Sequence, residues 1–141
     1  MALLDAIEHC DGHAANFLDL PPDSKVNRVR TALELVLADP NVKTLLINVF
    51  GGGIMRCDTI SDAILMMNST SPLNKPLVVN LSGTNANLAN RRLKESMPQI
   101  RLAANLPEAA SLAVEIANQS IDHSRKDDKN TSWLSRFSRR F

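Results

Sequence analysis

The sequence has few cysteines and no long apolar run, and these absences exclude several classes of protein. Two cysteines, Cys10 and Cys57, are too few for a disulfide framework, so we expect reduced thiols and a cytosolic type of compartment. No window approaches about 18 uninterrupted apolar residues, which argues against a transmembrane helix. The first residues lack a basic stretch followed by an apolar core, so no signal peptide is expected.

A large net charge and recognisable groups of catalytic residues are also absent. The formal net charge is +1, which does not indicate a nucleic acid or a membrane surface as partner. Cys10 and His13 flank a predicted helix end, but two ligands without a second pair make a poor metal site, so we expect no metal. The acidic residues show no pairing typical of acid–base catalysis, and no Ser–His–Asp or Cys–His set follows from the spacing.

What the sequence does contain is the pattern of one α/β domain. Apolar strands are predicted at 14–20, 44–50, 77–82 and 99–103. Five helices are predicted between and around these strands, two of them over residues 2–10 and 85–95. The other three begin at a capping residue: one runs from Asp23 or Ser24 to 38, one from Asp58 or Thr59 to 68, and one from Asn105 to 119. All five glycines fall at predicted boundaries, with Gly12 as the expected C′ residue of the first helix. Strands that alternate with helices predict a parallel sheet.

Residues 120–141 form a separate tail with six basic and three acidic side chains. The stretch over 124–132 is polar, and we expect it to be disordered. The last nine residues would place Trp133, Phe137 and Phe141 on one face of a helix, a basic amphipathic pattern usable on a membrane or in a partner's groove. A frayed terminus is the simpler interpretation, so we do not expect membrane contact.

The most informative stretch is a buried strand that runs into three glycines, Gly51, Gly52 and Gly53, and then into a helix. A glycine-rich turn before a helix directs unpaired N–H groups at one point, which suits a phosphate or carboxylate. The stretch matches neither the dinucleotide fingerprint nor the P-loop, so glycine serving geometry alone is the alternative. Arg56 could neutralise a bound anion or pair with Asp58, and both interpretations stay open.

Several neighbouring side chains are interpreted as structural. Cys57 lies at a helix N-terminus, where a thiol pKa can be lowered, but we interpret it as a buried packing residue. Asn48 lies inside an apolar strand and is expected to satisfy nearby backbone rather than to bind a substrate. Met66 and Met67 are expected in the core.

Residues 50–58 (FGGGIMRCD) resemble a segment of the β subunit of succinyl-CoA synthetase, or succinate–CoA ligase. Residues 15–19 (ANFLD), 76–85 (PLVVNLSGTN) and 103–110 (AANLPEAA) fit the same family in the same order, so the likeness covers residues 1–119. It implies a flavodoxin-like, three-layer parallel sheet with strand order 2-1-3-4-5. Residue 1 falls within the family's first helix, so we expect the central first strand to be lacking and the isolated chain to be marginally stable.

The resemblance also implies a function for the glycine turn. In that family the residues at the positions of Gly53, Ile54 and Met55 contact the carboxylate substrate. The turn and helix start face a phosphohistidine on an α subunit, which here assigns that position to Gly51, Gly52, Arg56 and Asp58. ATP or GTP, Mg²⁺ and CoA are implied for the full enzyme and none for this chain alone, in the cytoplasm or the mitochondrial matrix.

Four departures from the family keep an alternative open. There are three glycines where the family has two, prolines at 21 and 22 replace a glycine-rich turn, and Asn80 and Ser82 replace an Arg and a Glu. The fourth departure is the missing strand. The two prolines, the missing strand and the tail over residues 120–141 favour a truncated, non-catalytic paralogue that acts as a binding or regulatory module. A phosphoacceptor domain is disfavoured because no Asp cluster lies at the strand ends. We expect no ligase activity from the chain alone.

Overall fold

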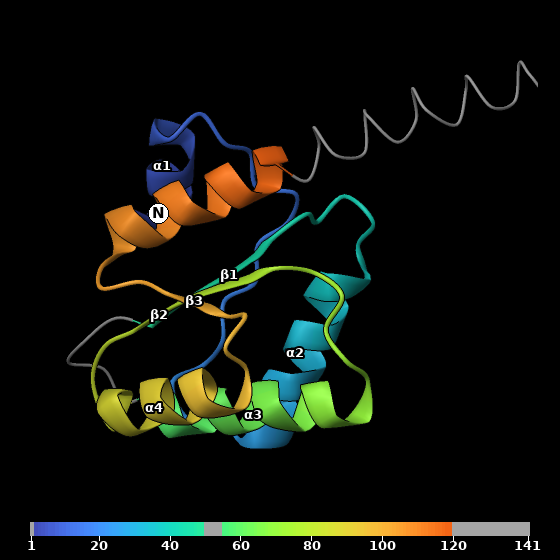
Figure 1. The fold of residues 1–141 in the computed structure, drawn as a ribbon, viewed down its shortest axis with the longest axis vertical. Helices are drawn as coiled ribbons and strands as arrows, with labels where there is room; N and C mark the ends of the chain where they lie inside the picture. Colours follow the sequence, from blue (N-terminus) through green and yellow to red (C-terminus); the bar gives the residue numbers. More distant parts are fainter. Residues whose placement is uncertain (1, 50–54, 120–141) are drawn as a thin grey trace, which may run out of the picture.

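Three parallel strands form the middle layer of the structure, a computed structural model that describes residues 2–49 and 55–119 (Figure 1). They are β1 (Leu45–Val49), β2 (Leu77–Leu81) and β3 (Arg101–Leu102), in the order β1-β2-β3. Leu45 lies opposite Leu77, and Val79 lies opposite Leu102. The strands predicted at 44–50 and 77–82 are confirmed, and the one at 99–103 is present in shorter form.

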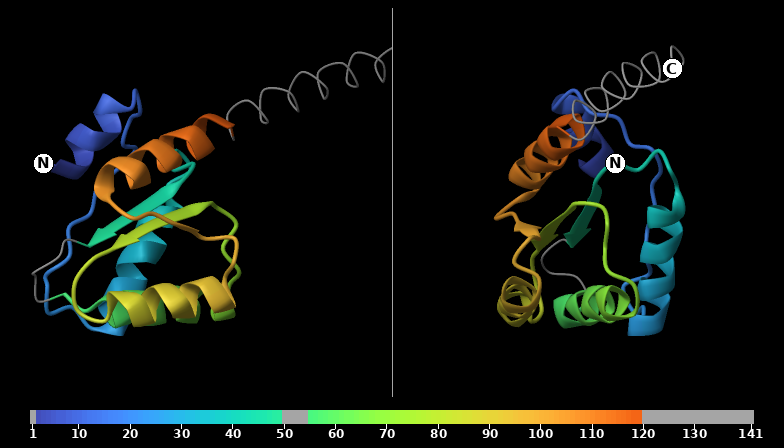
Figure 2. Two further views of the ribbon diagram at one scale, coloured as in Figure 1. Left: turned by 60° about the vertical axis from the view of Figure 1, so that its left-hand side comes forward. Right: turned by 45° about the vertical axis from the view of Figure 1, so that its right-hand side comes forward.

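Two layers of helices enclose this sheet, as the three views of Figures 1 and 2 show. The helices are α1 (Ala2–His9), α2 (Val26–Ala38), α3 (Cys57–Thr70), α4 (Ala86–Ser96) and an unlabelled helix over residues 106–119. One face is covered by α2, α3 and α4, and the other by α1 and the 106–119 helix. This arrangement confirms the predicted flavodoxin-like α/β class. None of the helices in the described residues is long and apolar enough to cross a membrane.

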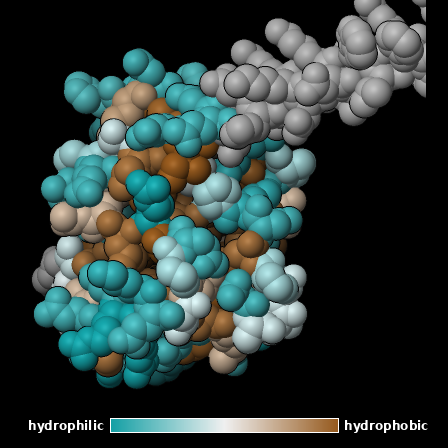
Figure 3. All heavy atoms as spheres, in the orientation of Figure 1, coloured by the Kyte–Doolittle hydropathy of each residue, from teal (hydrophilic) through white to brown (hydrophobic). Residues whose placement is uncertain are grey.

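The core lies on both faces of β2. Val78 and Val79 are neighbours on this strand and point to opposite faces, yet both are fully buried. Val79 belongs to the larger cluster with Ile64 and Leu93, while Val78 packs against the alanines of the 106–119 helix. Burying a side chain such as Ile64 contributes roughly 1.5–3 kcal/mol. Apolar residues are visible between the two helical layers in the space-filling view (Figure 3).

The buried face of α3 confirms part of the predicted core and corrects one residue of it. Ile60, Ile64 and Met67 share the buried face of α3, as expected. Met66 is 40% exposed, so its placement in the core was wrong. The reason is geometric, because a residue next to Met67 is turned about 100° away from it on a helix with 3.6 residues per turn.

The strand predicted at 14–20 is wrong. These residues form no strand, and Phe17 and Leu18 are exposed by 39% and 46%. The segment is held by Asn16 Nδ2, which donates a hydrogen bond of 3.0 Å to Asp39 Oδ2. A strand needs a neighbour for its N–H and C=O groups, and within the described part of the chain none lies beside this segment.

The end of α1 also differs from the prediction. Asp11, not Gly12, has the left-handed conformation, with φ of 61°. Asp11 N–H donates to Glu8 O and Gly12 N–H donates to Ile7 O, at 2.9 and 3.0 Å, the two bonds of a Schellman motif. Glycine is required at position 12 for space, because an added Cβ would lie 2.5 Å from Val114 Cγ2.

The starts of two other helices test the predicted caps. Asp23 and Ser24 do not cap α2, whose N-cap is Lys25. The Ser24 hydroxyl instead donates to Pro21 O at 2.6 Å and closes a turn. The predicted cap Asn105 is confirmed, since its Oδ1 accepts a bond of 2.9 Å from the amide of Glu108.

The contact at Gly12 yields a stability prediction. Gly12→Ala places a methyl group against Val114 and Ile7, so the free energy of unfolding should fall by about 1–3 kcal/mol. Adding Val114→Ala should restore most of this loss, because it removes the methyl group in the way. Urea unfolding of the single and double variants measures both effects. A double variant no more stable than Gly12→Ala would show that the two residues do not clash.

Candidate functional site

The candidate site lies where β1 and β2 end. In parallel α/β sheets, ligands bind beyond the carboxyl ends of the strands. Phe50, Gly51, Gly52, Gly53 and Ile54 follow β1 and lie outside the described residues. The description resumes at Met55, which is partly buried and packs against the larger core cluster.

The start of α3 is tied to the loop that follows β2. The amide of Cys57 donates a hydrogen bond of 3.0 Å to Thr84 O. This loop needs two unusual backbone conformations, with φ of 114° at Gly83 and 59° at Asn85, before α4 begins at Ala86. The start of α3 and the loop after β2 are therefore adjacent at this point.

Arg56 and Asp58 form a two-pronged ion pair at the start of α3. Nε donates to Oδ1 at 3.1 Å, and Nη2 donates to Oδ2 at 3.0 Å. The Arg56 side chain is 61% exposed and that of Asp58 is 18% exposed. The guanidinium lowers the pKa of Asp58, and the Asn85 side chain lowers it further by hydrogen bonding. Of the two interpretations of Arg56, this arrangement shows the pairing with Asp58.

The predicted helix cap at Asp58 or Thr59 is wrong. The N-cap of α3 is Arg56, with no hydrogen bond from its side chain, and the helix begins at Cys57. The Asp58 carboxylate is occupied by the guanidinium, so it does not cap. It still lies in the first turn, where the helix dipole favours a negative charge.

Cys57 is a packing residue, as predicted. It is completely buried, and its Sγ lies 3.6 Å from the carbonyl oxygen of Ser82. Burial raises the pKa of the thiol, and the charge of Asp58 raises it further. The thiolate needed for nucleophilic chemistry is therefore disfavoured, despite the helix N-terminus.

A buried amide pair beside this edge is a feature that the sequence analysis missed. Asn48 on β1 lies opposite Asn80 on β2, and Asn80 Nδ2 donates to Asn48 Oδ1 at 2.7 Å. The expectation that Asn48 satisfies nearby backbone is therefore wrong. Asn48 Nδ2 and Asn80 Oδ1 are buried without a partner among the described residues. Equivalent positions of asparagine in two adjacent apolar strands were the available signal.

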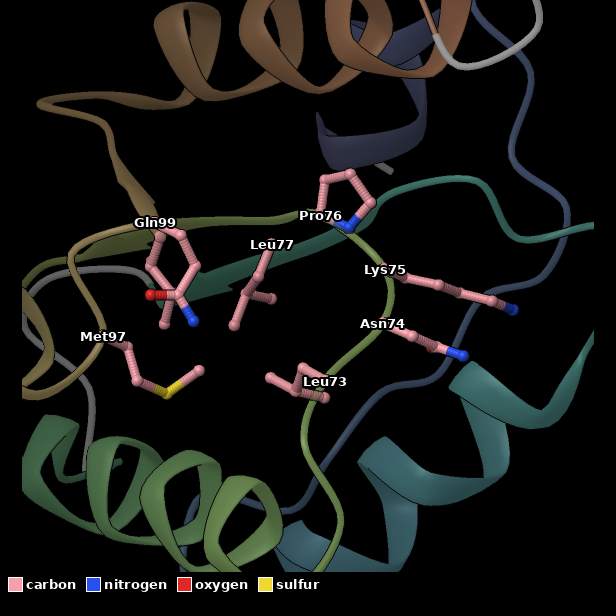
Figure 4. A pocket seen from close by; sticks show the side chains of 8 residues that line it. Leu73, Asn74, Lys75, Pro76, Leu77, Met97 and Gln99 are labelled. Carbon is pink, nitrogen blue, oxygen red and sulfur yellow. The ribbon is translucent and has the colours of Figure 1, made fainter. Parts of the chain in front are cut away.

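A cavity of about 300 Å³ lies at the other end of the sheet from the candidate site (Figure 4). Leu73, Leu77 and Met97 point into it, whereas Lys75 points away. The Lys75 ammonium group donates to the carbonyl oxygens of Leu37 and Asp39, both at 2.9 Å, at the carboxyl end of α2. The cavity has an apolar lining and lies at the amino ends of the strands, so it is not the candidate site.

Metal ligands do not gather in the part of the chain that the structure describes. No group of three or more His, Cys, Asp or Glu side chains there is arranged to hold an ion. What the start of α3 offers is backbone N–H groups and one guanidinium, which together suit an anion.

A parallel α/β sheet with helices on both faces is the architecture of the flavodoxin-like class. The sequence model of the CoA-ligase family matches residues 1–116. The chain belongs to the CoA-ligase family.

Three curated relatives illustrate this membership, each named succinate–CoA ligase [ADP-forming] subunit beta. The protein of Campylobacter hominis is 42% identical over 119 residues, 84% of this chain and 30% of the relative. That of Geobacillus kaustophilus is 40% identical over 116 residues, 82% of this chain and 30% of the relative. That of Methylobacillus flagellatus is 44% identical over 114 residues, 81% of this chain and 29% of the relative. The chain thus spans about 30% of the length of these relatives.

The ion pair of α3 yields a prediction about pH. Because the folded pKa of Asp58 lies below its ordinary value of 3.8, the carboxylate stabilises the fold above that value, and this contribution disappears as the pH falls through the folded pKa. Asp58→Asn should therefore lower the urea midpoint near pH 7 and leave it unchanged near pH 2. Asp62→Asn, on the same helix, is the control for loss of a more exposed carboxylate. A difference that persists undiminished at pH 2 would contradict the role of the charge.

Proposed function

We propose that this chain forms part of an acyl-CoA ligase of the succinate–CoA ligase type, where it supplies the substrate-carboxylate turn and a helix N-terminus for a phosphoryl group. The observation that carries this proposal is the family match over residues 1–116, which includes the strand, the turn and the start of α3. The relatives' name identifies them as ADP-forming ligase subunits.

We assign the substrate carboxylate to Gly53, Ile54 and Met55. The packing of Met55 against the core supports this assignment, because it fixes the end of the turn relative to β1 and α3. A carboxylate held by backbone N–H groups needs a rigid cradle, since each misplaced donor loses most of its hydrogen bond. The bond between Cys57 N–H and Thr84 O adds to this rigidity.

The phosphoryl group of an α subunit's phosphohistidine is assigned to the start of α3, with Gly51, Gly52, Arg56 and Asp58. The helix N-terminus attracts an anion through its N–H groups and dipole. Arg56 uses two of its five N–H donors on Asp58, so three are left for an oxyanion. The contribution is electrostatic stabilisation of charge, not nucleophilic attack.

The remaining components are proposed for the complete enzyme. The relatives' printed name supports CoA and an adenine nucleotide. An α subunit, ATP or GTP as the nucleotide, Mg²⁺, and a setting in the cytoplasm or the mitochondrial matrix are proposed on the family resemblance. We assign the metal and the nucleotide to other parts of the enzyme, because this chain spans only about 30% of the length of its relatives.

A second candidate function is a non-catalytic module that docks an α-like subunit through the same edge. Residues 14–20 pair with no strand of the described sheet, and this favours the non-catalytic module. A domain whose sheet lacks a pairing holds the turn between β1 and α3 less firmly. The paired Arg56 and Asp58 favour it as well, since the carboxylate offsets the positive charge offered to a phosphoryl group.

An exchange experiment separates the two functions. Residues 1–119 would replace the matched segment of the Campylobacter hominis subunit, expressed with that organism's α subunit. We expect formation of succinyl-CoA from succinate, CoA and ATP. Gly53→Asp should reduce it by about 100-fold or more and raise the KM for succinate, because a fixed carboxylate repels the substrate's own. Met66→Asp, on the exposed face of α3, is the matched control and should retain activity within about twofold.

Each contrary result has its own meaning. An inactive exchange protein that still binds the α subunit would support the non-catalytic module. An active protein in which Gly53→Asp leaves the KM for succinate unchanged would place the carboxylate elsewhere. The isolated chain should form no succinyl-CoA, and turnover by it alone would contradict the assignment of nucleotide and CoA to other parts.

A further inference from the structure

The backbone of Asn85 is unusual for its place in the chain. Asn85 is the N-cap of α4, and N-cap residues ordinarily have an extended backbone, as Lys25 and Arg56 do at the starts of α2 and α3. Asn85 has φ of 59° and ψ of 24°, in the left-handed region. Glycine adopts this region without steric cost, whereas a residue with a side chain is strained there. The presence of a side chain at this position therefore needs an explanation.

The side chain of Asn85 does not cap the helix that it precedes. Asparagine is a preferred N-cap residue because its side-chain oxygen can accept a hydrogen bond from the first N–H groups of a helix. Within the described residues, Asn85 makes no such bond to α4. The backbone closes the turn instead, since the amide of Ala86 donates to Gly83 O at 3.2 Å and that of Ala89 donates to Asn85 O at 3.0 Å. The start of α4 thus does not use the Asn85 side chain.

The Asn85 side chain instead reaches Asp58, in the first turn of α3. Its amide donates a hydrogen bond to the Asp58 carboxylate. The backbone brings the two residues together, because the amide of Cys57 donates to Thr84 O at 3.0 Å. Asp58 follows Cys57 in the sequence, and Asn85 follows Thr84. The contact therefore joins the loop after β2 to the helix that carries the candidate anion site.

The Asp58 carboxylate thus accepts hydrogen bonds from two separate elements. Arg56 donates from Nε at 3.1 Å and from Nη2 at 3.0 Å, and Asn85 donates from the loop after β2. An exposed ion pair by itself holds its two side chains weakly, because water competes and both side chains lose rotamer freedom. A donor from a second element restricts the carboxylate further. It thereby also restricts the guanidinium, whose side chain is 61% exposed.

We propose that Asn85 is a positioning residue of the anion site at the start of α3. It holds the Asp58 carboxylate in one orientation, and the carboxylate in turn holds the Arg56 guanidinium. The N–H donors of Arg56 that Asp58 does not use then keep a fixed place for a phosphoryl oxygen. This inference rests on the proposed function, which assigns the phosphoryl group to the same site. It adds a residue that acts on that group only through Asp58 and Arg56.

The first test measures whether Asn85 immobilises Arg56. Asn85→Gly removes the side chain and keeps the turn, because glycine adopts φ of 59° without strain. NMR relaxation of the ¹⁵N-labelled chain gives the order parameter of the Arg56 Nε–H group. It should fall by about 0.2 or more, the difference between rigid and flexible groups. Arg30, whose Nε donates to Glu34 at 3.0 Å, is the internal control. Asn87→Ala removes another exposed amide side chain from α4 and should leave both groups unchanged.

The second test separates positioning from a structural role, in the exchange protein assembled with its α subunit. Asn85→Gly should lower kcat by about fivefold and leave the KM for succinate within about twofold, because Arg56 is assigned to the phosphoryl group and not to the carboxylate. With Arg56→Met already present, Asn85→Gly should change kcat by less than about 1.5-fold, since no guanidinium is left to hold. Asn85→Ala adds backbone strain and lowers the urea midpoint, yet should give the same kcat as Asn85→Gly.

The results that overturn this proposal differ from those that overturn the proposed function. An unchanged Arg56 order parameter in Asn85→Gly overturns the proposal, whether or not the exchange protein is active. So does an unchanged kcat in an active exchange protein. A loss of kcat that is equally large with Arg56→Met, or that appears in Asn85→Ala and not in Asn85→Gly, shows a structural role and also overturns it. An inactive exchange protein contradicts the proposed function, and a fall in the Arg56 order parameter then still supports the positioning role.

Discussion

The pairing of β1 with β2 is the interaction on which the rest of the structure depends. Its hydrogen bonds run from Leu45 N–H at one end to Val49 O at the other. They align the carboxyl ends of both strands, and so bring the start of α3 within 3.0 Å of the loop at Thr84. Both helical layers pack on these two strands, through Val79 on one face and Val78 on the other. The position of the candidate site is therefore a consequence of this one ladder.

A strand or helix could be predicted from the sequence when the residues that it pairs with or packs against lie within the described chain. The patterns for β1, β2 and α3 were sufficient because their partners lie within the described chain. The apolar run at 14–20 was an equally good strand pattern, yet Phe17 and Leu18 are exposed, since a strand also needs a neighbour. The predicted helix caps at Asp58 and Ser24 were wrong for a local reason. The Asp58 carboxylate binds Arg56, and the Ser24 hydroxyl donates to the carbonyl oxygen of Pro21. Competition of this kind is not visible in composition or periodicity.

The family was predictable from the sequence, and the family model over residues 1–116 confirms it. The anion site at the glycines before α3 stays a prediction. The bidentate geometry between Arg56 and Asp58 required coordinates to choose between two open interpretations. The Asn48–Asn80 pair was missed because each residue was considered within its own strand, whereas its contact crosses between strands. At Cys57, burial raises the pKa of the thiol, and the charge of Asp58 raises it further.

The central claim is that the turn between β1 and α3 binds a carboxylate, and NMR titration of the ¹⁵N-labelled chain with succinate tests it most directly. The account predicts that saturating succinate shifts the amide signals of Gly53, Met55 and Cys57, with smaller changes at Thr84 across the hydrogen bond that joins the two loops. Signals around Leu73 and Met97, at the far cavity, should stay in place. Shifts confined to that cavity, or none at the turn at saturation, would contradict the account.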